Sequence, residues 1–164
     1  MKKACERPDD DKFTAWPLLL EAHGLLVEEL EKALVAQGGP PLAWYDVMVQ
    51  LSSAPEGMLP MKELAESVLL SKSGVTRLVD RMAAAGYVTR DSCPTDRRVV
   101  YAKLTDRGRE VFDSVRPQHL DDVRRLFTDH LTDTEARAIK NALMKIVSAV
   151  RNANGAQEER AEAG

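Results

Sequence analysis

The side chains with the clearest chemistry in this sequence are hydroxyls and cations gathered in one short stretch. They are Ser71, Lys72, Ser73, Thr76, Arg77 and Arg81. Hydroxyl and guanidinium groups near the start of a helix suit phosphate oxygens and the edges of bases. We expect base reading by Ser73, Thr76 and Arg77, which lie early on one helix face. Phosphate contacts are expected from Ser71, Lys72, Ser73 and Arg81, and from Lys103 further along the chain.

Two more cations follow in a segment rich in turn-forming residues. Arg97 and Arg98 come directly after Asp96, between a strand expected at 87–90 and a second strand expected at 99–104, where apolar residues alternate. An arginine at the tip of a thin β-hairpin can enter the minor groove of DNA, where the negative potential is enhanced.

The helix that positions the first group is expected at 73–85. Its buried face is predicted from apolar residues at i, i+3, i+4 and i+7, which are Val75, Leu78, Val79 and Met82. Gly86 supplies the left-handed residue that ends such a helix. A shorter helix at 61–68 precedes it, and two helices followed by a hairpin form a winged helix-turn-helix. We therefore predict a mainly α protein with a small β wing, whose DNA-binding lobe spans 59–105.

Longer helices are expected on both sides of this lobe. Thr105 is expected to cap the helix that follows the wing, Pro117 to kink or break it, and Pro17 to move the start of the first helix toward Ala15. A capping box at 132–135 opens the last helix. The expected helices are 12–37, 42–53, 106–130 and 133–151.

The flanking helices carry more apolar surface than a lobe of this size can cover. A second copy of the chain would supply the missing partner. The sequence thus divides into a polar, disordered arm at 1–11, supporting helices at 12–58, the lobe, C-terminal dimerisation helices at 106–151, and a small polar, disordered tail at 152–164.

Charge is distributed unevenly along the chain. The whole sequence has a formal net charge of −3, but residues 59–109 carry ten basic and six acidic side chains, a local charge of +4. A basic lobe on an acidic body fits a protein that presents one face to phosphates. Ordinary scatter of charge is the alternative interpretation.

Several functional classes find no support in the sequence. There is no signal peptide, no apolar run long enough to span a membrane, and no nucleotide-binding or hydrolase motif. We expect a cytoplasmic protein without catalytic activity, cofactor or metal. His23 and His119 fall on apolar stripes, where buried, hydrogen-bonded histidines are the usual outcome; a pH-sensitive or metal-binding seam between two copies is the alternative.

The motifs together resemble the multiple-antibiotic-resistance regulator (MarR) family. The resemblance rests on SKSGVTRLVDRMAAAGYVTR at 71–90, DRR at 96–98 and LTDRG at 104–108, and it extends over roughly Phe13 to Arg151. It implies a homodimer joined through the first and last helices, double-stranded DNA as partner, a palindromic operator and a ligand-responsive repressor. By the match to the wing motif, Arg98 would enter the minor groove and Asp96 would orient it.

The resemblance also implies an effector, usually a small phenolic or other organic anion held between the dimer helices and the lobe. Urate-responsive members match this sequence at Asp46, Arg77 and Arg90, and Trp16 is a further candidate. Those members carry their tryptophan on an additional N-terminal helix that this sequence lacks, which weakens the assignment of Trp16.

Two other readings stay open. Cys5 or Cys93 could sense oxidants, although neither has a neighbour that would clearly lower its pKa. A winged helix can also serve as a protein-interaction module that does not bind DNA.

Overall fold

The computed structural model describes residues 10–68, 72–92, 96 and 98–162, without the side chains of residues 72, 73 and 154–162. The elements are α1 (Asp11–Ala36), α2 (Leu42–Ser53), η1 (Pro55–Gly57), β1 (Met58–Pro60), α3 (Met61–Ser67), α4 (Lys72–Ala84), β2 (Val88–Ser92), β3 (Val100–Leu104), α5 (Asp106–Leu126), η2 (Thr128–His130) and α6 (Asp133–Glu162). The chain forms two compact units, Met1–Asp122 and Val123–Gly164, which are described separately.

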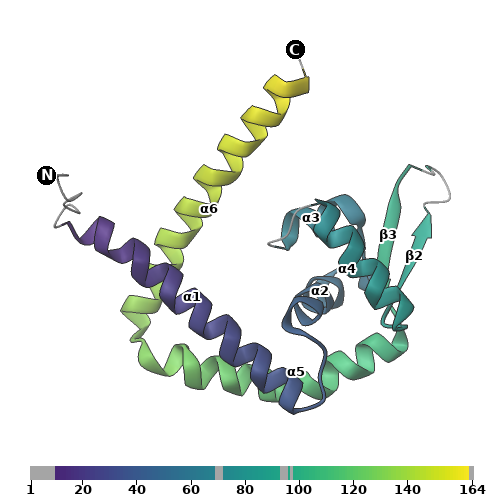
Figure 1. Cartoon of the computed structure of the whole chain (residues 1–164), viewed down its shortest axis with the longest axis horizontal. Helices are drawn as coiled ribbons and strands as arrows, with labels where there is room; N and C mark the ends of the chain where they lie inside the picture. The colour runs from purple at the N-terminus through teal and green to yellow at the C-terminus, as the bar shows by residue number, and fades with distance from the viewer. Residues whose placement is uncertain (1–9, 69–71, 93–95, 97, 163–164) are drawn as a thin grey trace, which may run out of the picture. The chain divides into compact units, whose positions relative to one another are not determined.

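The sheet of the first unit is antiparallel, with strand order β1-β3-β2. Its β2 and β3 strands form the hairpin seen in Figure 1. The hairpin between β2 and β3 was predicted, with strand ends displaced by one or two residues. β1 was not predicted; it pairs Met58 with Lys103 and Pro60 with Tyr101 of β3. Three residues are too few to show an alternating pattern, and a proline argues against a strand unless it lies at an edge. The predicted mainly α winged helix-turn-helix fold is confirmed.

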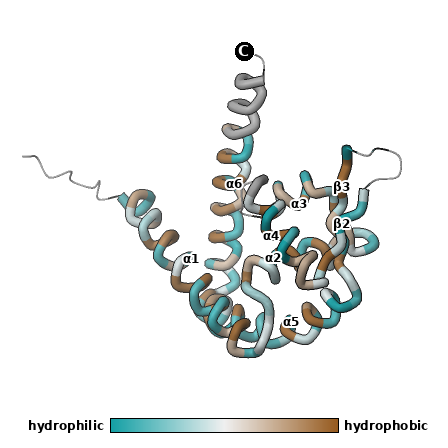
Figure 2. The backbone as a smooth tube through the Cα atoms, turned by 45° about the vertical axis from the view of Figure 1, so that its right-hand side comes forward, coloured by the Kyte–Doolittle hydropathy of each residue, from teal (hydrophilic) through white to brown (hydrophobic). Residues whose placement is uncertain are grey.

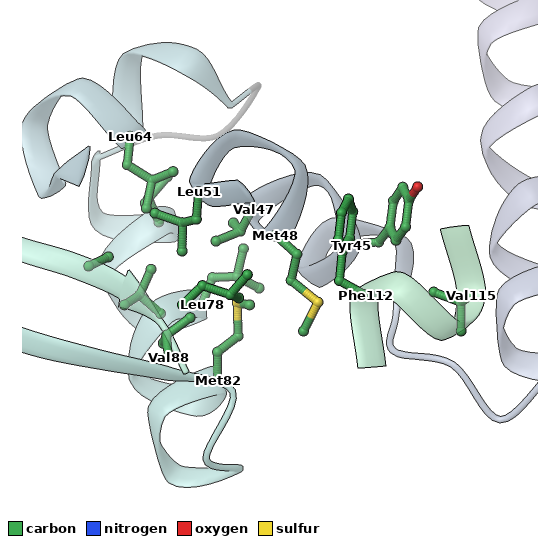
Figure 3. Packing of buried hydrophobic residues seen from close by; sticks show 14 of the residues in the cluster. Tyr45, Val47, Met48, Leu51, Leu64, Leu78, Met82, Val88, Phe112 and Val115 are labelled. Carbon is green, nitrogen blue, oxygen red and sulfur yellow. The ribbon is translucent and has the colours of Figure 1, made fainter. Parts of the chain in front are cut away.

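The inner face of α4 anchors this unit's core. Its predicted apolar residues are all buried: Val75 and Val79 are 0% exposed, Met82 is 0% exposed and Leu78 is 3% exposed. They pack against Val47, Met48, Leu51 and Leu64 of α2 and α3 and against Val88 of β2 (Figure 3). Because one face of α4 is fixed in the core, the opposite face is held outward.

A tight junction joins the end of α4 to the start of α5. The hydroxyl of Thr105 donates to the carbonyl of Gly86 at 2.8 Å and accepts from the N–H of Gly108 at 2.9 Å. The predicted cap at Thr105 is therefore confirmed, and Gly86 has the expected positive φ of 79°. A Cβ on Gly108 would lie 2.1 Å from the carbonyl oxygen of Tyr87, so the two segments approach more closely than any side chain allows.

An aromatic cluster joins α2 to α5. The ring of Tyr45 lies 5.3 Å from that of Phe112 and 4.3 Å from that of His119. His119 is buried, as predicted, but its Nδ1 has no hydrogen-bond partner among the described residues. Burial lowers the pKa of His119, and Asp122 opposes that shift. His23 was also expected to be buried and is exposed on α1 in this single chain.

Three expectations about the helices were wrong: a start of the first helix near Ala15, an end of α5 at 130, and a disordered tail after 151. The first helix begins at Asp11, because Asp10 caps it by accepting from the N–H of Lys12 at 3.0 Å, and Pro17 lies inside it. α5 continues through Pro117 without a break and ends at Leu126. Residues 152–162, expected to be a disordered tail, extend α6; their alanines, glutamates and arginine are good helix formers. Residues 1–9 of the expected arm lie outside the described chain.

The two long terminal helices each carry hydrophobic residues along their length (Figure 2), and large apolar side chains on both are exposed. On α1 these include Phe13, Trp16, Leu20 and Leu25. On α6 they are Leu143, Met144, Ile146, Val147 and Val150, and the capping box that opens this helix is present, with the N–H of Glu135 donating to Thr132 Oγ1 at 3.3 Å. Within the described ranges, no helix has the length and apolarity needed to cross a membrane.

Candidate nucleic-acid interface

The outer face of α4 presents the side chains expected to read DNA. Thr76, Arg77 and Arg81 are exposed, as is Asp80. Lys72 and Ser73 lie in the first turn of α4, but their side chains, like the whole of Ser71, are outside the described part of the chain. The phosphate and base contacts expected of these three residues remain predictions.

The wing carries Arg98 on a defined support. The side chain of Arg98 is 91% exposed. Asp96 Oδ1 accepts from the backbone N–H of Arg98 at 3.0 Å and from its Nε at 3.1 Å, and Oδ2 accepts from Nη2 at 3.2 Å. These bonds hold the pKa of Asp96 below its usual value. The predicted Asp96–Arg98 contact is thus present, while Arg97 lies outside the described residues.

A hollow of about 570 Å³ opens where the recognition helix α4 meets the wing; we call it the wing hollow. Its polar side chains come from four elements or their margins and include Thr76, Arg90 and Arg98, all named from the sequence. Lys62 and Glu63 of α3 also line it, and neither was predicted from the sequence as a site residue. Nothing in their spacing distinguishes them from any exposed pair on a short helix; only the fold brings them beside the wing.

An ion pair connects α4 to β2. Arg90 Nη1 donates to Asp80 Oδ1, and the two side chains are 34% and 52% exposed. Asp80 thus contacts a residue of β2, ten positions further along the chain. Arg90 reaches it because β2 runs beside α4 (Figure 1).

The four residues proposed for an effector are not all found at the wing hollow. Arg90 lines the wing hollow, whereas Arg77, Asp46 and Trp16 do not. Trp16 is 61% exposed on α1. Neighbouring groups partly desolvate the carboxylate of Asp46 and raise its pKa, although the residue as a whole is exposed on α2.

Other candidate chemistry finds little support. No cluster of three metal-ligating side chains occurs among the residues that the structure describes. Cys5 and Cys93, the candidates for redox sensing, both lie outside those residues.

The last phosphate candidate, Lys103, is exposed on β3 opposite Thr89 of β2.

The helix pair α3 and α4 is followed by the β2–β3 hairpin, and the outer face of α4 is exposed beside that hairpin. This arrangement places the chain in the class of winged helix-turn-helix proteins. Residues 39–99 match the family model described as MarR family. AbsC, a MarR family transcriptional regulator from Streptomyces coelicolor, is 34% identical, with a TM-score of 0.83 over 90% of this chain and 99% of that chain. Sco3205 from the same organism, solved in complex with DNA, is 31% identical, with a TM-score of 0.80 over 84% of this chain and 89% of that chain. The chain belongs to the MarR family of transcriptional regulators.

A curated relative covers less of the chain. The transcriptional regulator YkoM of Bacillus subtilis is 31% identical over 83 residues, which is 51% of this chain and 54% of YkoM. The chain thus spans about half the length of that relative.

Proposed function

We propose that this chain regulates transcription in the cytoplasm by binding a palindromic operator as a homodimer and that it acts as a ligand-responsive repressor. The observation that carries the proposal is the convergence of the α4 outer face and the wing on one hollow, through Thr76, Arg90 and Arg98. The cations that line this hollow outnumber its carboxylate, Glu63. Family membership and the DNA complex of Sco3205 support the same function.

The two DNA-contacting elements would enter different grooves. α4 would lie in the major groove, with Ser73, Thr76 and Arg77 at base edges. The wing would follow the backbone, with Arg98 in the minor groove. Phosphates would be held by Ser71, Lys72, Ser73, Arg81 and Lys103, and Arg97 would be a further DNA contact of the wing. In this arrangement Asp96 holds the guanidinium of Arg98 in place in the free protein. The side chain of Arg98 then loses less conformational entropy when DNA binds.

The uncovered apolar faces of α1 and α6 support the proposed dimerisation. Trp16 is 61% exposed and Met144 is 60% exposed, and large exposed apolar patches usually mark interfaces. A symmetric dimer would place its two recognition helices about one turn of DNA apart, roughly 34–36 Å. A dimer seated on a promoter blocks polymerase without any further contact, which favours repression over activation.

The effector would be a small organic anion, phenolic or urate-like. Arg90 supports this proposal because it lines the wing hollow together with the cations Lys62 and Arg98. Arg77, Asp46 and Trp16 remain the other proposed contacts. Thermal-shift screening with salicylate and urate tests the class, and the absence of a shift with either compound rejects it.

Binding to the DNA upstream of the protein's own gene tests the main proposal. Fluorescence anisotropy with fragments of that region, against a scrambled duplex of equal length, should give a specific, salt-dependent complex of one dimer per site. Arg77→Ala should reduce the specific complex more than the scrambled one, because a base contact carries sequence information. Equal affinity for every fragment would favour a protein-interaction module instead.

A further inference from the structure

The ion pair between Asp80 and Arg90 occupies a position that DNA binding alone does not explain. Asp80 lies one helical turn after Thr76 on α4, so the two side chains share the exposed face. A carboxylate there repels phosphates, and a helix that only needed affinity for DNA would be better without it. The contact of this carboxylate with Arg90 indicates a role in holding the wing and not in binding DNA.

The position of Arg90 on β2 explains why it meets the helix. Alternate residues of a strand point to the same face, so Arg90 shares the inward face with Val88, which is 2% exposed. Its partner across the ladder, Ala102 of β3, is 0% exposed. Arg90 therefore lies on the core face of the sheet, at the point where the inward side chains of β2 change from apolar to polar. Its guanidinium reaches Asp80 at the edge of α4.

The pair links the two elements that contact DNA. α4 and β2 are already joined at their near ends by the turn at Gly86, where the N–H of Tyr87 donates to the carbonyl of Met82 at 3.0 Å. Asp80 and Arg90 add a second tie, further from that turn and nearer the tip of the wing. The core contacts of Val88 already hold the base of β2 against α4. The Asp80–Arg90 pair extends this contact toward the tip of the wing and so limits bending of the outer part of the wing away from α4.

We propose that Asp80 is a positioning residue for operator recognition. Its carboxylate holds Arg90, sets the angle between α4 and the wing, and so aligns the major-groove and minor-groove contacts without touching DNA itself. The inference rests on the proposed DNA-binding function and deepens it. The predicted effect is opposite to the one expected from charge alone: removing a negative charge from a DNA-facing helix should weaken specific binding.

The experiment compares Asp80→Asn with wild type in anisotropy titrations against the operator and against a scrambled duplex. Affinity for the operator should fall about 3- to 10-fold, the size expected when one coupled pair is broken. Affinity for scrambled DNA should stay equal or rise, because a charge that repels phosphates has been removed. The ratio of specific to non-specific affinity is the decisive readout, since general loss of structure would lower both affinities.

Three further variants sharpen the comparison. Asp91→Asn removes the same charge from an exposed position on β2, where the carboxylate accepts only from Thr89 among the described residues, and it should leave the ratio unchanged. Asp80→Glu keeps the carboxylate and should restore most of the ratio. In an Arg90→Gln background, Asp80→Asn should cause no further loss, because the pair is already broken. Thermal unfolding of each free protein confirms that it is folded.

The two levels of the proposal fail in different ways. If the wild type has no specific site, the proposed function falls and the role of Asp80 falls with it. If the wild type is specific but Asp80→Asn keeps or raises the ratio, the positioning role alone is overturned. The same holds if Asp80→Asn and Asp91→Asn change the ratio equally, because the effect is then one of charge and not of the pair.

Discussion

Arg98→Ala is the most direct test of the wing. The side chain is 91% exposed and its polar contacts among the described residues go to Asp96 alone, so its removal should leave the free fold intact. Any loss of operator affinity then reports on DNA binding and not on folding. The substitution removes one guanidinium from the surface that faces DNA and leaves α4 unchanged.

The expected magnitude has two parts. Loss of one arginine contact should cost about 1–3 kcal/mol, or roughly 5- to 140-fold in affinity. Loss of one charge near the phosphates should also lower the slope of log K against log salt by about 0.9. Between 50 and 200 mM salt that slope corresponds to roughly a 3.5-fold change, so the defect of the variant should shrink by that factor at the higher salt.

Anisotropy titrations at several salt concentrations measure both parts together. Asp96→Ala is the matched control, because it removes the support of Arg98 but keeps its charge. It should weaken operator binding less than Arg98→Ala does and leave the salt slope close to that of wild type. If Arg98→Ala keeps both the wild-type affinity and the wild-type slope, Arg98 does not contact DNA.

Three other predictions concern the fold and its dependence on pH. Phe112→Ala should lower the free energy of unfolding by about 3–5 kcal/mol, measured in urea, because the ring is buried against Tyr45. Gly108→Ala should cost at least about 1–3 kcal/mol in the same assay, since its Cβ would overlap the carbonyl of Tyr87. Burial lowers the pKa of His119 in the folded state, so below its unfolded value near 6.5 the unfolded chain binds more protons. Stability should therefore fall as the pH drops below that value, and His119→Phe should flatten this part of the pH profile; an equally steep profile would assign it to other groups.

Much of the lobe could be predicted because its signals are local. The spacing of Val75, Leu78, Val79 and Met82 within one helix predicted the buried face of α4. The cap at Thr105 needs only the N–H three residues later. The Asp96–Arg98 contact joins residues two apart. Such features depend on the backbone of a few consecutive residues, and local patterns describe them well.

What the sequence could not show depends on contacts between distant segments. β1 is a strand because β3 offers it a partner more than forty residues later. Arg90 meets Asp80 ten residues away through the alignment of β2 with α4, and sequence spacing favours a partner on the same helix instead. Lys62 joins the wing hollow only because α3 packs beside the hairpin. These features required the fold.

The junction between α4 and α5 limits how an effector could act. Thr105 ties the end of α4 to the start of α5 through Gly86 and Gly108. The guanidinium of Arg107 adds a contact across this junction, 5.2 Å from the centre of the Tyr87 ring. A junction bonded and packed on several sides does not act as a hinge, so a movement of the first part of α5 must carry α4 with it. Ligand binding would then change operator affinity by moving the whole lobe and thus the spacing between the two recognition helices of a dimer.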